Sequence, residues 1–287
     1  MDNRYINLLF KSNNRELKVY KNSSYKLLEI EGIESGDYDI KTSDNANNDG
    51  CFITSRRIES RVITLKFLID NNNNIEIERR RMISFFSPKT DGKLVVDYSG
   101  KKRLINYTVS DLEIEITENV FQNQVVEVEL LCADPFFHEV VPVKVDVASW
   151  KPKFYFPLKL STLMGLREPN LIATINNDGD TRAGIIVKFI ATGTVVNPSF
   201  FNVDTREYFK INKTMKDGDT ITVNTNTGHK TVVSNEAGKI TNILNLWDLK
   251  GSFMQLDLGD NLFRYNADSG LENLDILLYF DPSYLGI

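Results

Sequence analysis

Residues 112–116 have the sequence Leu-Glu-Ile-Glu-Ile, and residues 126–130 have the sequence Val-Glu-Val-Glu-Leu. In both stretches the apolar side chains recur at every second position, which places them on one face of an extended strand and the carboxylates on the other. The same alternation occurs at residues 62–69, 141–147 and 221–223. It is typical of antiparallel strands with one buried face. The sequence therefore predicts a mainly β protein.

Turn residues separate these strands at the spacing of a β-sandwich or small barrel. They include Asp91-Gly92, Ser99-Gly100, Gly179, Gly218, Gly228 and Gly238. One helix is predicted between Asn73 or Asn74, as its cap, and Pro88, which ends it. Its predicted apolar face comprises Ile75, Met82, Ile83 and Phe86. A second helical turn is predicted near residues 242–249.

The strand pattern is interrupted near residues 148–157. Trp150-Lys151-Pro152-Lys153 and Pro157 suit a short, stiff linker. Downstream, short strands alternate with stretches rich in Asn, Asp, Thr and Gly, which is typical of jelly-roll sandwiches. We therefore predict a first domain at residues 1–148, a linker at 149–156 and a second domain at 157–287.

The composition is that of a soluble globular protein. The chain has 287 residues, 41 % hydrophobic and 25 % charged, which is enough for two domains with their own cores. No apolar run approaches the roughly 20 residues of a membrane-spanning helix. The N-terminal residues do not resemble a secretory signal. Cys51 and Cys132 are expected to be reduced core thiols, which fits synthesis in a cytosol.

The charge pattern argues against nucleic-acid binding. The net charge is −5, whereas proteins that grip phosphate usually carry a basic excess. Two basic runs, Arg56-Arg57 and Arg79-Arg80-Arg81, are the exception. Because Glu59, Glu76 and Glu78 flank these runs, we expect local ion pairs or a subunit contact there.

The sequence offers no catalytic, metal or cofactor site. His138 follows Pro135-Phe136-Phe137 and is expected in a structural role, and His229 is expected at the surface. Residues 45–50 begin like a calcium loop, but Arg56 occupies the position of the bidentate glutamate, which favours a simple turn. The remaining acidic candidates have ordinary explanations. Glu113, Glu115, Glu127 and Glu129 are expected side by side on a solvated strand face, and Asp178, Asp180, Asp217 and Asp219 in turns.

The first half of the chain resembles the siphophage tail component family, and within it the distal tail proteins. The resemblance lies in the order of strands, one helix and further strands, followed by Cys132-Ala133-Asp134-Pro135-Phe136-Phe137. An Asp-Pro-Phe step after a final strand is one of the recurring marks of the family.

The second half is similar to the same family through short features in a fixed order. They are Asn176-Asn177-Asp178-Gly179-Asp180, Gly193 with Asn197-Pro198, Asn202, Gly218-Asp219 followed by Ile221, Val223, Asn224 and Thr225, Gly228, and Leu258-Gly259-Asp260-Asn261 with Phe263 and Tyr265. Two positions depart from the family. Leu258 stands where proline is common, and Thr205-Arg206 replaces a common Thr-Gly.

The resemblance implies a specific architecture and role. An N-terminal β-sandwich or split-barrel-like ring domain with one helix forms a homohexamer, and a galectin-like or jelly-roll C-terminal β-sandwich projects outward. Such a ring joins the tail tube protein to a tail-associated fibre or lysin protein and to receptor-binding or baseplate proteins at the virion tail tip. DNA passes through its lumen. Six copies at −5 carry about −30, which would discourage DNA from adhering.

Two other functions remain open. In the first, the C-terminal sandwich is a carbohydrate-binding module for host cell-wall glycan, with Trp247, Tyr208, Phe209 or Tyr265 stacking on sugar rings, although these aromatics equally suit a sandwich core. In the second, a glycoside hydrolase uses two carboxylates facing each other across a cleft. The candidate aspartates lie in Gly-rich turns, where aspartate ordinarily forms the hydrogen bonds of the turn. We therefore expect no enzymatic activity.

Overall fold

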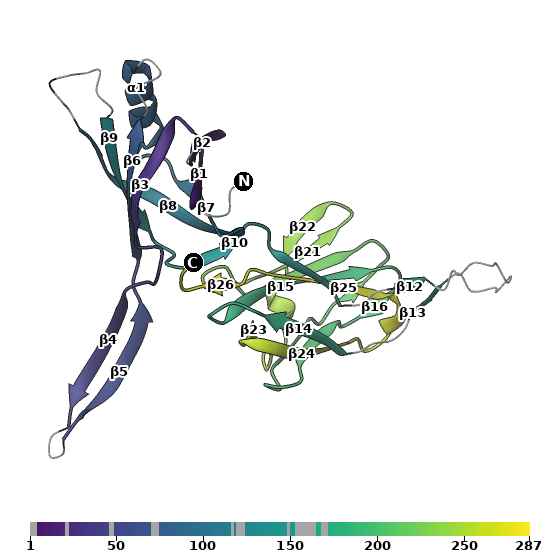
Figure 1. Ribbon diagram of the computed structural model, residues 1–287. Coiled ribbons are helices and arrows are strands. Elements are labelled where there is room, and N and C mark those ends of the chain that lie inside the picture. Colours follow the sequence, from purple (N-terminus) through teal and green to yellow (C-terminus); the bar gives the residue numbers. More distant parts are fainter. Residues whose placement is uncertain are drawn as a thin grey trace, which may run out of the picture. The chain divides into compact units, whose positions relative to one another are not determined.

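The structure is a computed structural model that describes residues 5–20, 23–45, 49–69, 75–115, 118, 124–147, 150–152, 165–167 and 172–287. The chain forms two compact units (Figure 1). Unit 1 contains Met1–Val140 together with Tyr284–Ile287, and unit 2 contains Val141–Ser283. Unit 2 is therefore inserted, in sequence, into unit 1.

Unit 1 contains ten strands and the only α-helix among the described residues. They are β1 (Asn7–Ser12), β2 (Arg15–Val19), β3 (Tyr25–Glu31), β4 (Tyr38–Asp44), β5 (Cys51–Ile58), β6 (Arg61–Ile69), α1 (Ile75–Phe85), β7 (Gly92–Tyr98), β8 (Lys101–Ile114), β9 (Gln124–Cys132) and β10 (Phe137–Glu139). The last strand of the chain, β26 (Ser283–Tyr284), pairs with β10.

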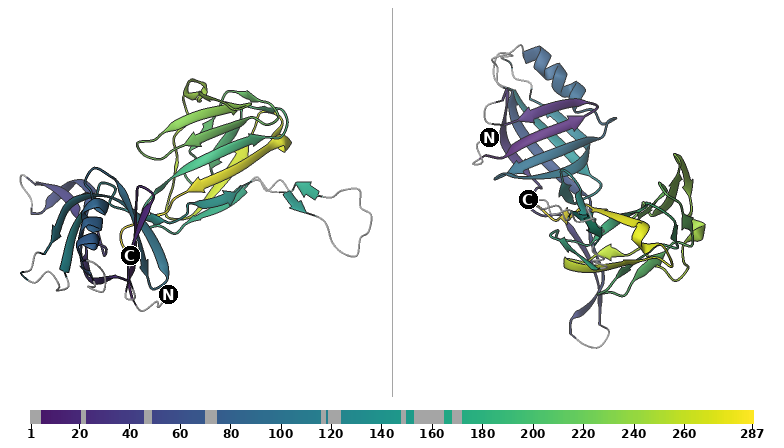
Figure 2. Two further views of the ribbon diagram at one scale, coloured as in Figure 1. Left: turned by 90° about the horizontal axis from the view of Figure 1, so that it is seen from above. Right: turned by 90° about the vertical axis from the view of Figure 1, so that its right-hand side faces the viewer.

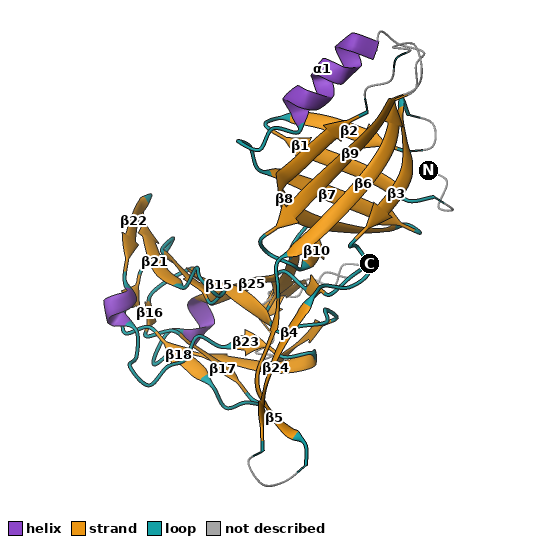
Figure 3. Cartoon of the chain, turned by 90° about the vertical axis from the view of Figure 1, so that its left-hand side faces the viewer, coloured by secondary structure: helices purple, strands orange, loops and turns teal. Residues whose placement is uncertain are grey.

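The main sheet of unit 1 has the order β2-β1-β7-β8-β9-β6-β3. The long strand β8 joins the β2-β1-β7 part of this sheet to the β9-β6-β3 part. Residues 101–107 pair with β7 and residues 108–114 with β9, with a change of register between Val109 and Asp111. A bulge of this kind bends a strand and increases its twist. The sheet therefore curls around a core, as Figure 3 shows, and the order ends at β2 and β3 without closing into a barrel.

The helix α1 lies across one end of the curled sheet (Figure 2). Met82 and Phe85 are buried on its inner face, and Phe86 follows it into the core, where its ring meets Phe10 edge-on at 5.3 Å. The predicted helix is therefore confirmed. Its predicted face is wrong at Ile83, which is 52 % exposed because the core contact passes through Phe85 instead. The proposed caps, Asn73 and Asn74, lie outside the described residues.

The C-terminal tail returns to unit 1. The buried guanidinium of Arg61 donates hydrogen bonds to the carbonyl oxygens of Pro135 (2.9 Å), Gly32 (2.7 Å) and Leu285. The backbone N–H of Ile287 also donates to Ile33 (3.2 Å). Burial lowers the pKa of Arg61. A buried cation must have its donors satisfied, so the tail is part of the structure of this unit.

In its described residues, unit 2 is built from short strands and two 3₁₀ turns. They are β11 (Val143–Asp146), β12 (Trp150–Pro152), β13 (Gly165–Arg167), β14 (Ile172–Asn177), β15 (Ala183–Ala191), β16 (Val195–Val196), β17 (Ser199–Asn202), β18 (Tyr208–Lys210), β19 (Thr214–Met215), β20 (Thr220–Asn224), β21 (Thr231–Glu236), β22 (Lys239–Asn242), η1 (Leu244–Leu246), β23 (Gln255–Leu256), β24 (Gly259–Asn266), η2 (Leu271–Asn273) and β25 (Leu274–Phe280). The turn predicted near residues 242–249 is therefore present as η1.

Two sheets of unit 2 form a sandwich. One has the order β11-β25-β15-β20-β21-β22 and the other the order β14-β24-β17-β18. Their inner faces share one core, in which Phe189 of the first sheet contacts Phe209 of the second at 6.0 Å. The predicted fold class, mainly β with two β-rich domains and one helix, is confirmed. None of the helices in the described part of the chain is long and apolar enough to span a membrane.

The two compact units divide between Val140 and Val141. The alternating valines at 143 and 145 pair with β25, which places β11 in the sheet of unit 2. Within the predicted linker, Trp150–Pro152 forms β12 and pairs with β13, whereas residues 149 and 153–156 lie outside the described part. The boundaries at 148 and 156 stay predictions.

Candidate functional site

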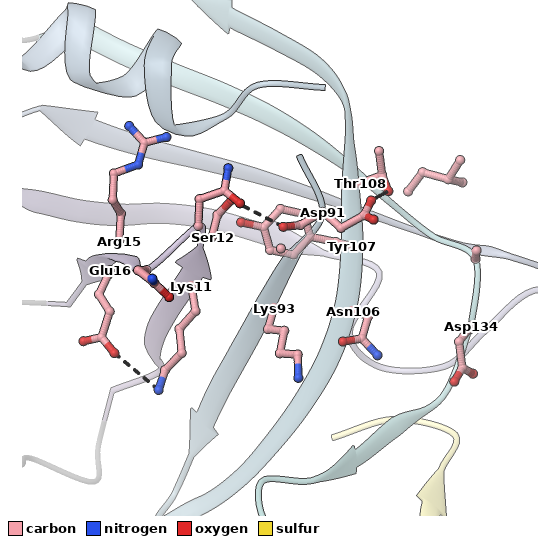
Figure 4. A pocket seen from close by; sticks show the side chains of 15 residues that line it. Lys11, Ser12, Arg15, Glu16, Asp91, Lys93, Asn106, Tyr107, Thr108 and Asp134 are labelled. Atoms are coloured by element: carbon pink, nitrogen blue, oxygen red, sulfur yellow. Dashed lines mark hydrogen bonds and ion pairs between the residues drawn. The ribbon is translucent and has the colours of Figure 1, made fainter. Parts of the chain in front are cut away.

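A groove of about 890 Å³ lies on the outer surface of unit 1 (Figure 4). Its lining combines three cationic and three acidic side chains, from Lys11, Arg15, Lys93, Glu16, Asp91 and Asp134. Tyr107 is buried beneath it against Gly92, where a side chain would collide with the ring. Burial raises the pKa of Tyr107.

The charges of this groove are mostly engaged with one another or with the backbone. Lys11 pairs with Glu16 at 3.3 Å, Arg15 donates to the carbonyl oxygen of Ser84 at 2.9 Å, and Asp91 accepts from Thr108 at 2.7 Å. Lys11 and Lys93 stand opposite each other in the register of β1 and β7. The groove is thus an open, mixed-charge surface, of the kind that fits a polar contact with another protein.

The hairpin of β4 and β5 extends away from the main sheet of unit 1 (Figure 1). These strands pair only with each other among the described residues. All but two of their residues are exposed, Asp39 and Ile58 being half-buried. Two-stranded hairpins without further strands are marginally stable in water, which makes these exposed strands a candidate surface for a protein contact.

Large apolar side chains are exposed on both faces of the hairpin, and more of them lie on one face than on the other. The register places Tyr38, Ile40, Ile53 and Cys51 on one face, where the three large apolar side chains are 55, 57 and 48 % exposed. The opposite face carries Asp39 and Arg57, which pair at 3.0 Å, and also Phe52, which is 67 % exposed. This arm was not predicted from the sequence, although the alternation at residues 38–40 and the polar turn after Asp44 are signals of it.

An acidic surface covers the outer face of strands β3, β6, β9 and β8. One row across these strands consists of Glu29, Lys66, Glu127 and Glu113, and the next consists of Glu31, Thr64, Glu129 and Asp111. The two rows hold six carboxylates and one cation. The predicted placement on the outer face is therefore confirmed for Glu113, Glu127 and Glu129, whereas Glu115 follows the end of β8 and is exposed.

Lys66 is the centre of this surface. Its ammonium lies 3.4 Å from Glu29 and 3.6 Å from Glu127, and the charge of Glu127 and the hydrogen bond to Glu29 raise its pKa. Glu113 stands directly opposite Glu127 in the register. Like charges at such positions destabilise a sheet by roughly 0.2–1 kcal/mol. Folding alone does not explain this arrangement.

The aromatics proposed to bind glycan lie in unit 2. Tyr265 is 3 % exposed and Phe209 is fully buried, so neither presents a ring face to a sugar, contrary to the stacking role proposed for them. Trp247 makes near-parallel ring contacts with Phe209 at 5.2 Å and Phe253 at 4.4 Å. Tyr208 is half-buried and donates its hydroxyl to Asp248 at 3.1 Å. The structure brings Trp247 and Tyr208 near each other around Asp248.

The histidines, the basic run around Arg81 and the loop after Asp44 show ordinary structural contacts in place of a binding site. His138 lies 2.9 Å from Asp134, and His229 is exposed in a turn. Arg81 pairs with Glu78 at 3.8 Å, which agrees with the expected local ion pairing. Asn45 and Gly50 close the turn between β4 and β5 through a backbone hydrogen bond of 3.4 Å, and residues 46–48 lie outside the described part.

Cys51 and Cys132 are both free, but only Cys132 is buried. Burial raises the pKa of Cys132 to about 12. The prediction of a core thiol is therefore correct for Cys132 and wrong for Cys51, because Cys51 lies in the exposed hairpin.

Two asparagines of the family resemblance, Asn202 and Asn261, stabilise turns through hydrogen bonds to the backbone. The buried Asn202 accepts hydrogen bonds from the backbone N–H groups of Asp204 (2.9 Å) and Thr205 (3.1 Å). The buried Asn261 similarly bonds the backbone of Asp257 and Gly259. Arg206, at the position of a common glycine, has a φ of 61°. Such a φ favours glycine, so the departure is a strained version of the same turn.

Comparisons with known proteins agree with these features. Residues 13–132 match the phage tail protein RIFT-related domain, and residues 178–284 match the siphovirus-type tail component, C-terminal domain. No curated protein matches the sequence. The fold is similar to the Dit protein of phage SPP1, described as a paradigm of the hub adsorption apparatus in phages that infect Gram-positive bacteria. That match has a TM-score of 0.69 at 12 % identity, over 97 % of this chain and 99 % of that one.

A second similar structure is a chain of the phage P2 baseplate in its activated conformation with calcium. Its TM-score is 0.52 at 9 % identity, over 97 % of both chains. At these identities the likeness concerns the fold. The two domain matches lie in the two units and together span most of the sequence. The chain therefore belongs to the siphophage distal tail protein family and is a structural component of the phage tail tip.

Proposed function

We propose that this chain is the structural hub of a phage, or phage-derived, tail tip. Six copies form a ring that joins the tail tube to the tail-tip proteins, and DNA passes through its lumen. The ring forms through the first domain, predicted at residues 1–148. The protein acts by assembly and geometry, without catalysis.

The exposed hairpin of β4 and β5 is the observation that carries this proposal. Its face with Tyr38, Ile40 and Ile53 combines three large exposed apolar side chains on a pair of strands that pair with no other strand among the described residues. Exposed apolar surface of this kind marks protein contacts. A second copy of the same chain is the occupant that we assign to it.

A ring provides that contact for every subunit. In a head-to-tail ring, one patch of each copy meets a different patch of the next, and the rotation closes. The hairpin is one such patch, and the mixed-charge groove of Figure 4 offers the polar character of the rim of an interface. The hairpin then gains the support in the ring that it lacks in a single copy.

The acidic surface fits the lining of the lumen. Its six carboxylates face one cation, Lys66, and stand in rows across four strands. A surface of this charge repels the phosphates of passing DNA, and the repulsion prevents adhesion. The Glu113–Glu127 pair costs stability within the subunit, which is consistent with a requirement imposed by function.

The family and the similar structures support the partners that we propose. The two similar folds come from a hub adsorption apparatus and from a baseplate. We propose that one side of the ring binds the tail tube protein. The other side binds a tail-associated fibre or lysin protein and, in some particles, receptor-binding or baseplate proteins.

The hairpin provides the test of this proposal. Ile40→Asp with Ile53→Asp places two charges on its apolar face, and Ser43→Asp with Ser55→Asp places two on the opposite face as a matched control. The first pair should reduce the ring to single copies in light scattering, whereas the control should keep the mass of the unaltered chain. Equal masses for both pairs would remove the hairpin from the interface.

Cys51 provides an independent readout on the same face. It is exposed in the single chain, whereas Cys132 is buried, with its pKa raised to about 12. Maleimide should therefore modify Cys51 in single copies and leave Cys132 unmodified. On assembly the reaction at Cys51 should slow, and undiminished reaction in rings would contradict the assigned contact.

A further inference from the structure

The tail Tyr284–Ile287 contacts the base of the hairpin of β4 and β5. Residues 32–37 lead into β4, and residues 59–61 follow β5, so these two segments are the legs of the hairpin. Between them, the backbone N–H of Glu59 donates a hydrogen bond to the carbonyl oxygen of Asp37 at 2.9 Å, which closes the hairpin. Both legs bond to the tail, which belongs to unit 1 together with the hairpin.

Arg61 joins the two legs of the hairpin to the tail. This residue is only 2 % exposed. Its guanidinium donates one hydrogen bond across the base to the carbonyl oxygen of Gly32 at 2.7 Å and another to that of Leu285 in the tail. A Cβ atom at Gly36 would lie 3.4 Å from the same guanidinium, so the leg before β4 packs closely against it. One buried cation therefore holds both legs and the tail.

The tail also contacts the leg before β4 directly. The backbone N–H of Ile287 donates a hydrogen bond to the carbonyl oxygen of Ile33 at 3.2 Å. Gly286 lies so close to Glu34 that a Cβ atom there would collide with the Glu34 carbonyl oxygen. Tyr284 is buried in the core of unit 1, and Ile287 packs against the same core. The tail is therefore anchored in the core on both sides of its contact with the leg.

Beyond its base, the hairpin has few contacts that could fix its direction. In the described part of the chain, β4 and β5 pair only with each other, and nearly all of their residues are exposed. Two-stranded hairpins are marginally stable in water, and regions with few buried contacts open locally at a low cost in free energy. The order of this hairpin therefore depends on the contacts at its base.

We propose that the tail is a strap that fixes the hairpin in the position in which it contacts a second copy of the chain. With the strap docked, the leg before β4 is held at Gly32, Ile33 and Glu34. Without it, this leg loses the contacts of Gly286 and Ile287, and the hairpin moves about its base. The inference rests on the proposed function for the partner of the hairpin, whereas the strap itself is testable in a single copy.

A strap and a general stabilising contact lead to different results. A tail that only stabilises unit 1 would affect the hairpin no more than any other buried contact of that unit does. A strap affects the hairpin first, because local opening of the hairpin requires less free energy than unfolding of the whole unit. Amide hydrogen exchange of β4 and β5 therefore distinguishes the two roles.

The experiment is hydrogen exchange, followed by mass spectrometry, on the full chain. All proteins carry Ile40→Asp with Ile53→Asp, so that no partner copy protects the hairpin. Gly286→Ala displaces the tail by collision with Glu34, and Arg61→Lys keeps the charge but replaces the guanidinium that reaches both legs and the tail. Met82→Ala is the control, since Met82 is fully buried on α1, at the opposite end of the sheet from the hairpin (Figure 1).

The hairpin should respond to the strap variants alone. In Gly286→Ala and Arg61→Lys, the amides of β4 and β5 should exchange at least about tenfold faster than in the background protein, and so should the amide of Ile287. In Met82→Ala, the hairpin amides should stay within about twofold of the background, although unit 1 is less stable.

Three results would overturn the strap. The first is unchanged exchange of the hairpin in both strap variants, and the second is equal acceleration of the hairpin in Met82→Ala. The third is a tail that stays protected in both strap variants, which would contradict the packing of Gly286 against Glu34. Complete unfolding of both strap variants would make the tail a general stabilising element and would count equally against the proposal.

Solution mass separates a failure of the strap from a failure of the proposed function. In the otherwise unaltered chain, Gly286→Ala should raise the concentration at which rings form at least about fivefold. Because coupling is reciprocal, ring formation should slow exchange at the Ile287 amide, and unchanged exchange there would contradict the coupling. If neither Gly286→Ala nor Ile40→Asp with Ile53→Asp changes the mass, the hairpin is not the ring contact, and the exchange result still decides the strap.

Discussion

The guanidinium of Arg61 donates a hydrogen bond to the carbonyl oxygen of Leu285, although the two residues are 224 positions apart in the sequence. The same group binds the carbonyl of Pro135, within the Asp-Pro-Phe step, and that of Gly32. Three segments of unit 1 therefore meet at one side chain. Tyr284 makes a second contact between the C-terminal tail and unit 1. Its ring packs against Arg103, and its hydroxyl donates a hydrogen bond to the Glu139 carboxylate at 3.1 Å.

Replacement of Arg61 should strongly destabilise unit 1. Arg61→Met leaves three part-buried carbonyl groups without their donor, and at about 1 kcal/mol or more for each we expect a loss of about 3 kcal/mol or more in the free energy of unfolding. Arg57→Met, which breaks the exposed pair with Asp39, should cost about 1 kcal/mol or less. Urea unfolding of both variants measures the difference, and equal small losses would show that the tail is not held through Arg61.

Alkaline pH should destabilise unit 1. Burial raises the pKa of Cys132 from 9.0 to about 12 and that of Tyr284 from 10.0 to about 12, and it raises the pKa of Tyr25 and Tyr107 in the same direction. The folded state holds these protons more tightly than the unfolded state. Their contribution is therefore fully present below pH 9 and is lost as the pH rises toward 12.

The contribution of Cys132 can be isolated within this range. Between pH 9 and 10 its thiol ionises in the unfolded chain before the tyrosines do, so Cys132→Ala should flatten the fall in stability there. Urea midpoints at pH 8, 9, 10 and 11 give the slope for both proteins. Identical slopes would assign the alkaline effect to other groups.

Substitution of glycine at Arg206 should stabilise unit 2. Its φ of 61° lies in the left-handed region, which costs other residues roughly 1–2 kcal/mol, whereas glycine pays an entropic cost of roughly 0.5–1 kcal/mol. Arg206→Gly should therefore raise stability by about 0.5–1 kcal/mol. Arg264→Gly, at an exposed position of β24, should lower it. Thermal unfolding distinguishes the two, and a destabilised Arg206→Gly protein would contradict the assigned strain.

Removal of one charge from the acidic surface should stabilise the single subunit. Glu113→Gln relieves the opposition to Glu127 and should add about 0.2–1 kcal/mol at low salt. The gain should shrink at high salt because ions screen exposed charges. Urea unfolding at two ionic strengths measures it. A loss of stability at low salt would show that Glu113 is held by an attractive contact.

The sequence predicted the elements whose pattern is local. Residues 112–114 lie in β8 and residues 126–130 lie in β9, and the helix predicted between Asn74 and Pro88 is present as α1. These elements follow from side-chain periodicity, which does not depend on the rest of the chain. The buried asparagines at 202 and 261 were likewise recognisable as turn residues.

The sequence did not predict features that depend on distant contacts. The return of residues 284–287 to unit 1 requires Arg61, and no periodicity links the two segments. Ile83 and Phe85 both suit an apolar helix face, and only the tertiary contact selects Phe85. Cys51 lies in an apolar strand like that of Cys132, but its strand is exposed because its hairpin pairs with no other strand of the described chain.

The mass of the purified chain in solution tests the central claim most directly. Light scattering, with negative-stain imaging of the same sample, should show rings of six copies, either alone or after addition of the tail tube protein. The lumen of those rings should be acidic. A chain that stays a single copy with and without the tube protein, or a ring with a strongly basic lumen, would contradict the account.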